Sequence, residues 1–222
     1  MGDHTQPRLV LLGKQGAGKG TQATRLAGHF GVPHVSTGDM FRALAVQGVQ
    51  VGLEAKRYMD QGDLVPDELV IAVVEESLAP GGTLDDGFIL DGFPRTLPQA
   101  VELDRVLDGR PLDLVIEIDV PREVVLERIA GRRVCEQCQR VYHVAMPPAA
   151  GWVCDTCGGA VRQRDDDTEA AIDRRLEHYE LRTVPIADHY RQQSRLVVID
   201  GIGEGDDVFE RMVKVVTDRL RD

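Results

Sequence analysis

The sequence predicts an α/β fold in which helices flank a parallel sheet and two small insertions interrupt that core. Three observations favour this class. Short apolar runs alternate with amphipathic helical stretches, a glycine-rich loop follows the first apolar run, and two segments break the alternation. The 222 residues fit one sizeable domain, and a hydrophobic fraction of 42% is enough to build its core.

The alternation gives the core elements in order. The predicted strands are Leu9–Leu12, His34–Ser36, Phe88–Leu90, Leu114–Asp119 and Leu196–Ile199. The predicted helices are Gly18–Phe30, Pro66–Leu78, Leu97–Leu107, Pro121–Ala130, Thr168–Gln192 and Asp207–Leu220. Pro66 and Pro121 suit a first helical turn because the N–H group that proline lacks has no helical partner there. Asp207 and Glu210 have the spacing of a capping box at the start of the last helix.

Two segments lack this rhythm and are predicted to be insertions. Residues 37–64 are rich in glycine and small side chains, and we expect a short helical insertion. Residues 131–167 contain all four cysteines and the only tryptophan, with little helical periodicity, so we expect a small inserted subdomain. The core then consists of residues 1–36, 65–130 and 168–222.

The loop from Gly13 to Thr21 has the spacing of a phosphate-binding P-loop. Its glycines allow consecutive N–H groups to face a polyphosphate, and a helix that begins near Gly18 adds its positive end. Lys19 supplies a full charge at the β- and γ-phosphates, and Thr21 or the loop backbone lies near the expected Mg²⁺. The alternative is an ordinary glycine-rich turn between a strand and a helix. The lysine in register after an apolar strand favours a nucleoside triphosphate site.

Composition limits the partners. The chain has 26 basic and 37 acidic residues, a formal net charge of −11, which argues against a long basic face for nucleic acid or for an anionic membrane. No stretch approaches the ~20 apolar residues of a membrane span. The polar start lacks the apolar segment of a signal peptide, so we expect a cytoplasmic protein without membrane or nucleic-acid partners.

Two CxxC pairs predict a structural zinc site. Cys135 and Cys138 form the first pair, Cys154 and Cys157 form the second, and fifteen residues lie between the two pairs. Each pair can hold one tetrahedral ion from its own side, and four sulfurs leave no open position for water. The alternatives are two disulfides, which a cytosolic compartment disfavours, or unligated thiols.

The run Phe88-Ile89-Leu90-Asp91-Gly92-Phe93-Pro94-Arg95, followed by Gln99, resembles a signature of the adenylate kinases. The glycine-rich loop and the run Ser36-Thr37-Gly38-Asp39-Met40 extend the resemblance, which is closest to the long form with a zinc-carrying lid. It implies an NMP-binding insertion at residues 37–64 and a lid at residues 131–167. It also implies the Mg²⁺-dependent reaction ATP + AMP ⇌ 2 ADP, which maintains the adenine nucleotide balance. The sequence offers no reason to expect more than a monomer.

The chain departs from the family pattern in its phosphate loop. Adenylate kinases usually have a small residue and then proline where this chain has Lys14 and Gln15. Lys14 would either tighten nucleotide binding or point to solvent, and Gln15 removes a rigid proline. The sequence leaves both questions open.

The resemblance also implies the catalytic residues. The nucleophile is an AMP phosphate oxygen that is already anionic at neutral pH, so no general base is required and cations should dominate the site. The implied catalytic set is Lys19, Arg95, Arg132, Arg164, Arg175, Asp166 and Asp167. Asp91 is implied to hold Mg²⁺ through water, or it caps the following turn. The aspartates Asp165 to Asp167 would also serve as caps of the next helix.

The two nucleotide sites are implied residue by residue. ATP is expected to contact Gly16, Ala17, Gly18, Lys19, Gly20, Thr21, Arg128, Arg132, Val141, Tyr142 and Gly203. AMP is expected to contact Thr37, Arg42, Asp63, Leu64, Val65, Gly92, Phe93, Pro94, Arg95, Gln99, Arg164 and Arg175. Thr37 would favour adenine and Gln99 would read its edge, whereas Arg128 would stack on the ATP base. Tyr142 is alternatively a hydrophobic anchor of the zinc hairpin.

Two other functions remain open from the sequence. One is a different nucleoside monophosphate kinase, including a GTP:AMP enzyme, because the donor base is weakly encoded. The other is a zinc-ribbon module that binds nucleic acid and carries a P-loop switch, which the charge of −11 disfavours.

Overall fold

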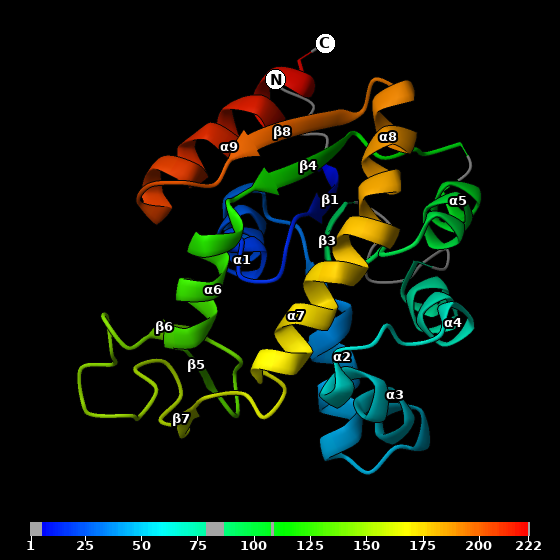
Figure 1. Cartoon of the computed structure of the whole chain (residues 1–222). Coiled ribbons are helices and arrows are strands. Elements are labelled where there is room, and N and C mark those ends of the chain that lie inside the picture. Colours follow the sequence, from blue (N-terminus) through cyan, green and yellow to red (C-terminus); the bar gives the residue numbers. More distant parts are fainter. Residues whose placement is uncertain (1–5, 79–86, 108, 222) are drawn as a thin grey trace.

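In this computed structural model, residues 6–78, 87–107 and 109–221 are described, and the other positions of the predicted core lie outside the described residues. The described strands of the core form one parallel sheet in the order β2-β3-β1-β4-β8. Figure 1 shows this sheet with helices on both sides. The strands are β1 (Arg8–Leu12), β2 (His34–Ser36), β3 (Phe88–Asp91), β4 (Leu114–Asp119) and β8 (Leu196–Asp200). The predicted α/β class and every predicted strand are confirmed, with end positions shifted by one residue at most.

The core helices also follow the prediction, with corrections. They are α1 (Lys19–Phe30), α4 (Asp67–Leu78), α5 (Leu97–Val106), α6 (Arg122–Gly131), α7 (Glu169–His178), α8 (Val184–Gln192) and α9 (Gly205–Arg219). The single helix predicted for residues 168–192 is wrong in its middle, because a π-helical turn at Tyr179–Thr183 separates α7 from α8. Helices α4 and α6 begin one residue after Pro66 and Pro121, so these prolines precede the helices.

The predicted capping box of the last helix is wrong. Helix α9 begins at Gly205 and takes Glu204 as its N-cap residue, with no side-chain cap hydrogen bond among the described residues. Asp207 lies inside the first turn of α9 together with Asp206. Both carboxylates still complement the positive end of the helix dipole there.

Each insertion contains short elements of its own. The first contains α2 (Thr37–Val46) and α3 (Gln50–Gln61), which pack so closely that a Cβ atom on Gly52 would lie 2.3 Å from the Ala45 amide nitrogen. The second contains the short antiparallel strands β5 (Arg132–Cys135), β6 (Val141–His143) and β7 (Val161–Arg162), in the order β6-β5-β7. Both insertions lie at the lower end of Figure 1, away from β8 and α9.

The core lies on both faces of the sheet. Successive side chains of β1 point to opposite faces, with Leu9 and Leu11 in one apolar cluster and Val10 and Leu12 in the other. Helices α1, α6 and α9 cover the first face, and α4, α5 and α8 cover the second. A strand covered on both faces is apolar throughout, which is why it was predictable as a continuous apolar run.

The strand order fixes the position of the site. From β1 the chain passes to β2 and β3 on one side of the sheet, and later to β4 and β8 on the other. Ligands of open parallel sheets bind at such a change of direction, at the carboxyl ends of the strands. The glycine-rich loop leaves the carboxyl end of β1, the strand at which the direction changes. Within the described residues, each helix is too short or too polar to cross a membrane.

Candidate active site

The loop between β1 and α1 is a tight, glycine-dependent turn. The Ala17 amide donates to the Lys14 carbonyl at 3.1 Å, which closes a four-residue turn. Gly16 has a φ of +83°, the value that the third residue of a type II turn requires. A Cβ atom on Gly16 would also lie 2.7 Å from the Ile129 side chain. Both conformation and space therefore require glycine here, and α1 begins at Lys19 as predicted.

The Lys19 ammonium group turns back into this loop. Its Nζ atom donates to the Gly13 carbonyl at 2.6 Å and to the Lys14 carbonyl at 2.9 Å. Burial lowers the pKa of Lys19 to about 8; the Asp91 carboxylate opposes this shift and Arg95 adds to it. A phosphate group would give this ammonium group the full negative charge that the loop carbonyls lack.

Asp91 lies at the carboxyl end of β3, beside the first turn of α1. A Cβ atom on Gly20 would lie 3.3 Å from its Oδ2 atom, and the Nε2 atom of His34 lies 3.8 Å from the same oxygen. Burial favours the neutral acid, but His34 and Lys19 outweigh it and hold the pKa of Asp91 below its ordinary value. The carboxylate is therefore anionic at neutral pH, the form that suits Mg²⁺ and its bound water.

The turn after β3 positions Arg95. Its Nε atom donates to the Gly92 carbonyl at 2.8 Å, and the Thr37 hydroxyl donates to the same carbonyl at 3.0 Å. The Thr183 hydroxyl, in the π-helical turn, donates to the Arg95 carbonyl at 3.1 Å. Arg95 itself is exposed, so its guanidinium group is fixed at one nitrogen and accessible to a ligand at the others.

Arginines of the second insertion and of α7 bind the buried carboxylates Asp166 and Asp167. Arg132 pairs with both oxygens of Asp167, and its Nε atom donates to Oδ2 at 2.9 Å. Arg175 donates to the Asp166 carboxylate at 2.5 Å and to the Met59 carbonyl of α3 at 2.7 Å. Arg175 therefore links α7 to the first insertion.

A second group of ion pairs joins the two insertions to each other. Asp39 of α2 accepts from Arg42 at 2.5 Å and from Arg164 at 3.4 Å. Arg42 also lies 3.9 Å from Asp166. Burial, together with the positive charges of Arg42 and Arg132, lowers the pKa of Arg164 to about 10.

Two guanidinium groups in this cluster have unused donors. The Nε atoms of Arg42 and Arg164 are buried and lack a hydrogen-bond partner among the described residues. A buried donor without an acceptor costs about 1–3 kcal/mol, more when it is charged. An anionic ligand with several oxygens, such as a phosphate group, would supply the missing acceptors.

A cavity of about 340 Å³ lies beside the first insertion. Its lining residues are Tyr58, Asp63, Leu64, Val65, Pro66, Asp67, Thr96, His178 and Arg182. The three consecutive residues predicted to line the AMP base pocket, Asp63 to Val65, are therefore found together at one cavity.

Gln99 is not among the residues that line this cavity. Its side-chain oxygen accepts from the Arg95 amide at 2.7 Å, and its nitrogen donates to Asp67 at 2.6 Å. The other oxygen of Asp67 accepts from the Thr96 hydroxyl at 2.9 Å. Gln99 thus reaches the cavity through Asp67, a residue that the sequence did not single out.

The residues predicted for the ATP base, Arg128 and Gly203, lie at the P-loop and at the loop that follows β8. Arg128 donates to the Ala17 carbonyl at 3.3 Å and to the Gly201 carbonyl at 3.0 Å. Its guanidinium group therefore bridges the P-loop and the loop that contains Gly203. Gly203 has a φ of +104°, a conformation that favours glycine.

Tyr142 and Val141 have different surroundings. Tyr142 is buried, and its hydroxyl donates to the Cys154 Sγ atom at 3.4 Å and accepts from the Asp155 amide at 2.9 Å. These contacts favour the alternative role of Tyr142 as an anchor of the cysteine hairpin. Val141 is 43% exposed and remains accessible to a ligand.

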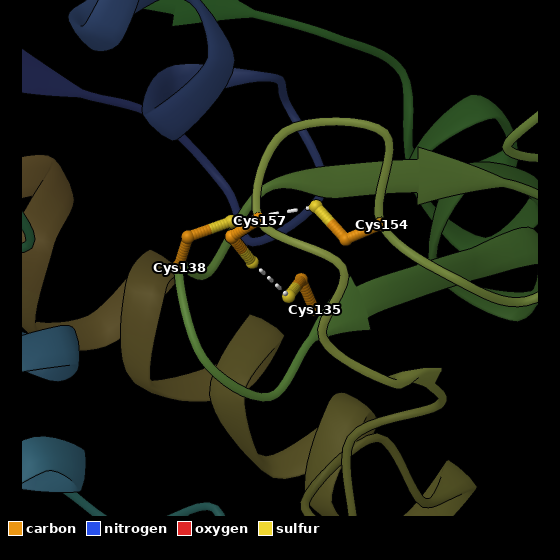
Figure 2. A group of neighbouring side chains, drawn as sticks. All are labelled: Cys135, Cys138, Cys154 and Cys157. Atoms are coloured by element: carbon orange, nitrogen blue, oxygen red, sulfur yellow. Dashed lines mark hydrogen bonds between the residues drawn. The ribbon is translucent and has the colours of Figure 1, made fainter.

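The four cysteines converge on one point, as Figure 2 shows. Their sulfur atoms all lie within 4.8 Å of one another, and the Cys135–Cys157 and Cys138–Cys154 pairs are each 3.5 Å apart. Tetrahedral Zn²⁺ with Zn–S bonds of about 2.3 Å places its sulfurs about 3.8 Å apart. A disulfide needs about 2.05 Å, so both disulfides are excluded in this structure, in which all four cysteines are free. The residues fit zinc.

The structure gives Lys14 three contacts of its own. Its Nζ atom lies 3.3 Å from the Val120 carbonyl and 3.5 Å from Asp119, and 5.7 Å above the ring of Tyr179. The ammonium group is therefore held at the carboxyl end of β4, instead of pointing freely into solvent.

One predicted role is wrong and one site residue was missed. The N-cap of α7 is Thr168, whose hydroxyl accepts from the Ala171 amide at 3.2 Å, so the aspartates before it do not cap this helix. Asp39 was named only within the run from Ser36 to Met40 and was given no role in the site, although it lies three residues before Arg42 on α2. That spacing places two side chains on one helix face and was a usable signal.

Comparisons with known proteins identify the family of this chain. The family model described as adenylate kinase matches residues 11–195. An adenylate kinase of Carboxydothermus hydrogenoformans is 50% identical over 205 residues, which cover 91% of this chain and 95% of that protein. Those of Bacillus licheniformis and Streptomyces avermitilis are 50% and 48% identical over 87% and 92% of this chain, covering 90% and 94% of their own lengths. The chain therefore belongs to the adenylate kinase family.

Proposed function

We propose that this adenylate kinase holds ATP and AMP with their phosphate groups facing each other inside a ring of cations. There it interconverts ATP and AMP with two ADP molecules. The observation that carries the proposal is the convergence of cations from the P-loop, the turn after β3, both insertions and α7 on one place. These cations are Lys19, Arg42, Arg95, Arg132, Arg164 and Arg175. Four carboxylates among them, Asp39, Asp91, Asp166 and Asp167, leave the ring positive in a chain whose net charge is −11.

The chemistry requires placement and charge neutralisation. An AMP phosphate oxygen attacks the γ-phosphorus of ATP, the bond from that phosphorus to the bridging oxygen breaks, and ADP leaves with the electron pair. Both oxygens are anionic, so no proton moves in this step. The work of the side chains is to hold the two phosphate chains in line and to spread the negative charge of the transferring group.

Each nucleotide has its own set of proposed contacts. The P-loop amides and Lys19 hold the ATP phosphates, with Arg128 and Gly203 at its base. Arg42 and Arg95 hold the AMP phosphate, and its base enters the cavity beside Asp63 to Val65. The unpartnered donors of Arg42 and Arg164 support this assignment because a phosphate would satisfy them.

The remaining predicted contacts are retained as proposals. The AMP phosphate side includes Gly92, Phe93 and Pro94, and the base side includes Thr37 and Gln99. The ATP side includes Thr21 and Val141.

Metal ions have two proposed roles. Asp91 would hold Mg²⁺ through water, and the ion would neutralise phosphate charge on the nucleotide. Cys135, Cys138, Cys154 and Cys157 would hold Zn²⁺ as a structural clip without a free coordination position. We further propose residues 37–64 as the NMP-binding insertion, residues 131–167 as the lid, and a monomer in the cytoplasm.

The acceptor base tests this function. The purified protein is supplied with ATP and Mg²⁺ and with AMP, GMP, CMP or UMP in turn, and nucleoside diphosphates are quantified by chromatography. We expect kcat/KM for AMP to exceed that for each other acceptor by about tenfold or more, because a site that hydrogen-bonds one base edge leaves polar groups unpaired with another. A preference for CMP or UMP would contradict the proposal. Absence of transfer with all four acceptors would contradict it as well.

A further inference from the structure

Gln15 links the phosphate loop to the end of the second insertion. Its Nε2 atom donates to Oδ1 of Asp167 at 3.1 Å, across 152 positions of sequence. Asp167 is a completely buried carboxylate, with 0% of its side chain exposed. None of the roles proposed above uses Gln15.

The backbone at Gln15 does not need this side chain. Gln15 is the second residue of the type II turn that the Ala17 amide closes on the Lys14 carbonyl, followed by Gly16 at a φ of +83°. Proline is favoured at the second position of such turns. The side chain of Gln15 can therefore be removed without changing the shape of the loop, and its contact with Asp167 has to be explained on its own.

The amide is oriented by Asp167 and not by a contact of its oxygen. The Oε1 atom of Gln15 is buried and has no hydrogen-bond partner in the described part of the chain. Only the NH₂ group can donate to a carboxylate, so the bond to Asp167 fixes which way the amide faces. The bond persists although it leaves that oxygen unsatisfied.

Asp167 binds Arg132 as well, so a contact that fixes the Asp167 carboxylate also restricts the Arg132 guanidinium group. Both carboxylate oxygens of Asp167 accept from the guanidinium group of Arg132, and Arg175 lies 3.9 Å from Oδ1. Two donors, from the P-loop and from the start of β5, and one further cation, from α7, thus surround one carboxylate. The Gln15 amide is the neutral donor among them, and it belongs to the loop that would hold the ATP phosphates.

We propose that Gln15 is a positioning residue that acts through Asp167 to hold Arg132 over the P-loop. The inference rests on the proposed function, in which Arg132 belongs to the ring of cations that spreads the charge of the transferring phosphoryl group. With the amide in place, Asp167 and its arginine partner are fixed relative to the ATP site before the nucleotide arrives. Without it, Arg132 retains its carboxylate partner but that pair is no longer fixed to the loop.

The experiment compares Gln15→Pro and Gln15→Glu with the wild type in the full-length, metal-loaded enzyme. Proline suits the turn and removes only the amide, whereas glutamate places a second carboxylate beside Asp167. We expect kcat/KM for ATP to fall about tenfold in Gln15→Pro and further in Gln15→Glu, since a hydrogen bond to a charged group contributes about that factor. The KM for AMP should stay within about twofold because Arg132 is not among the proposed AMP contacts. Gln192→Glu, at an exposed position on α8, is the charge-matched control.

A double-mutant cycle separates positioning from a structural effect. In an Asp167→Ala background, Gln15→Pro should change kcat/KM for ATP by less than about twofold, because the group through which Gln15 acts is gone. An equal loss in both backgrounds would overturn the proposal. So would an equal rise in the KM for AMP, or no change in either parameter. A wild-type protein without phosphoryl transfer would instead contradict the proposed function, so the two failures are distinguishable.

Discussion

At the scale of single residues, Lys19 combines two opposing demands. It has to be cationic to bind phosphate, yet it is buried in the loop with carbonyl partners alone, and its pKa is lowered to about 8. An ammonium group in such a place destabilises the ligand-free fold. The positive charge that Lys19 needs for phosphate binding therefore lowers the stability of the ligand-free chain.

Lys19→Met should show both sides of this opposition. We expect turnover to fall by about three orders of magnitude, as for other groups that stabilise transferring charge. Between pH 8 and 10.5 the unfolded lysine binds a proton that the folded one has lost, so wild-type stability should rise with pH across this window. The rise is at most about 3 kcal/mol.

Thermal unfolding at pH 7 and pH 9.5 measures this effect. Lys19→Met lacks the titrating group, so its melting temperature relative to wild type should be higher at pH 7 than at pH 9.5. Lys214→Met, at an exposed position on α9, is the control and should follow the wild type. Wild-type turnover in Lys19→Met would contradict its phosphate role. A difference in melting temperature that is constant with pH would contradict its lowered pKa.

At the scale of elements, the sequence predicted what is local and apolar. The central strands were predictable because both of their faces are covered, and the core helices because one face of each packs on the sheet. The π-helical turn at Tyr179–Thr183 was not predictable, since an added residue in a helix leaves the apolar pattern almost unchanged. No pattern in the sequence predicts the hydrogen bond between Gln15 and Asp167, because the two residues lie 152 positions apart in the chain.

The same contrast applies to the candidate site. The P-loop and the cysteine pairs were predictable because one short segment holds each group of residues. The contact of Gln99 with Asp67 spans 32 positions, and that of Arg132 with Asp167 spans 35. Such partners are fixed by the packing of whole elements, and only the structure gives them.

The stability of the second insertion depends on its four cysteines. Its own buried cluster consists of Cys135, Tyr142, Cys154 and Val161, too few side chains to stabilise a subdomain without a clip. Zinc bound to four thiolates would supply that stability directly.

Cys138→Ser tests this clip. We expect about one zinc per wild-type chain by elemental analysis and none in the variant, with a lower melting temperature and a smaller relative loss of turnover at low temperature. Thr156→Ser, between the second pair of cysteines, retains the hydroxyl that accepts from Arg140 and should keep both zinc and stability. A wild-type protein without zinc would refute the clip.

At the scale of the whole molecule, the two insertions differ in how they join the core. Phe41 of α2 and Ala55 of α3 belong to the apolar cluster on one face of the sheet. Among the described residues, neither sheet cluster contains a buried side chain from positions 132–167. The proposed lid is therefore attached to the core through its two ends and through ion pairs, whereas the other insertion contributes to the core itself.

This difference predicts that the lid can be removed without unfolding the protein. Replacing residues 133–163 by a short glycine–serine linker should leave a single cooperative unfolding transition, with AMP binding, measured by calorimetry, within about threefold of the intact chain. Phosphoryl transfer should fall by about a hundredfold or more, because the ATP phosphates would no longer be shielded from water. Phe41→Ala is the counterpart in the other insertion and should cost about 3–5 kcal/mol of unfolding free energy. Loss of cooperative unfolding on lid removal, or retention of full transfer, would show that the lid is integral to the core or dispensable for the reaction.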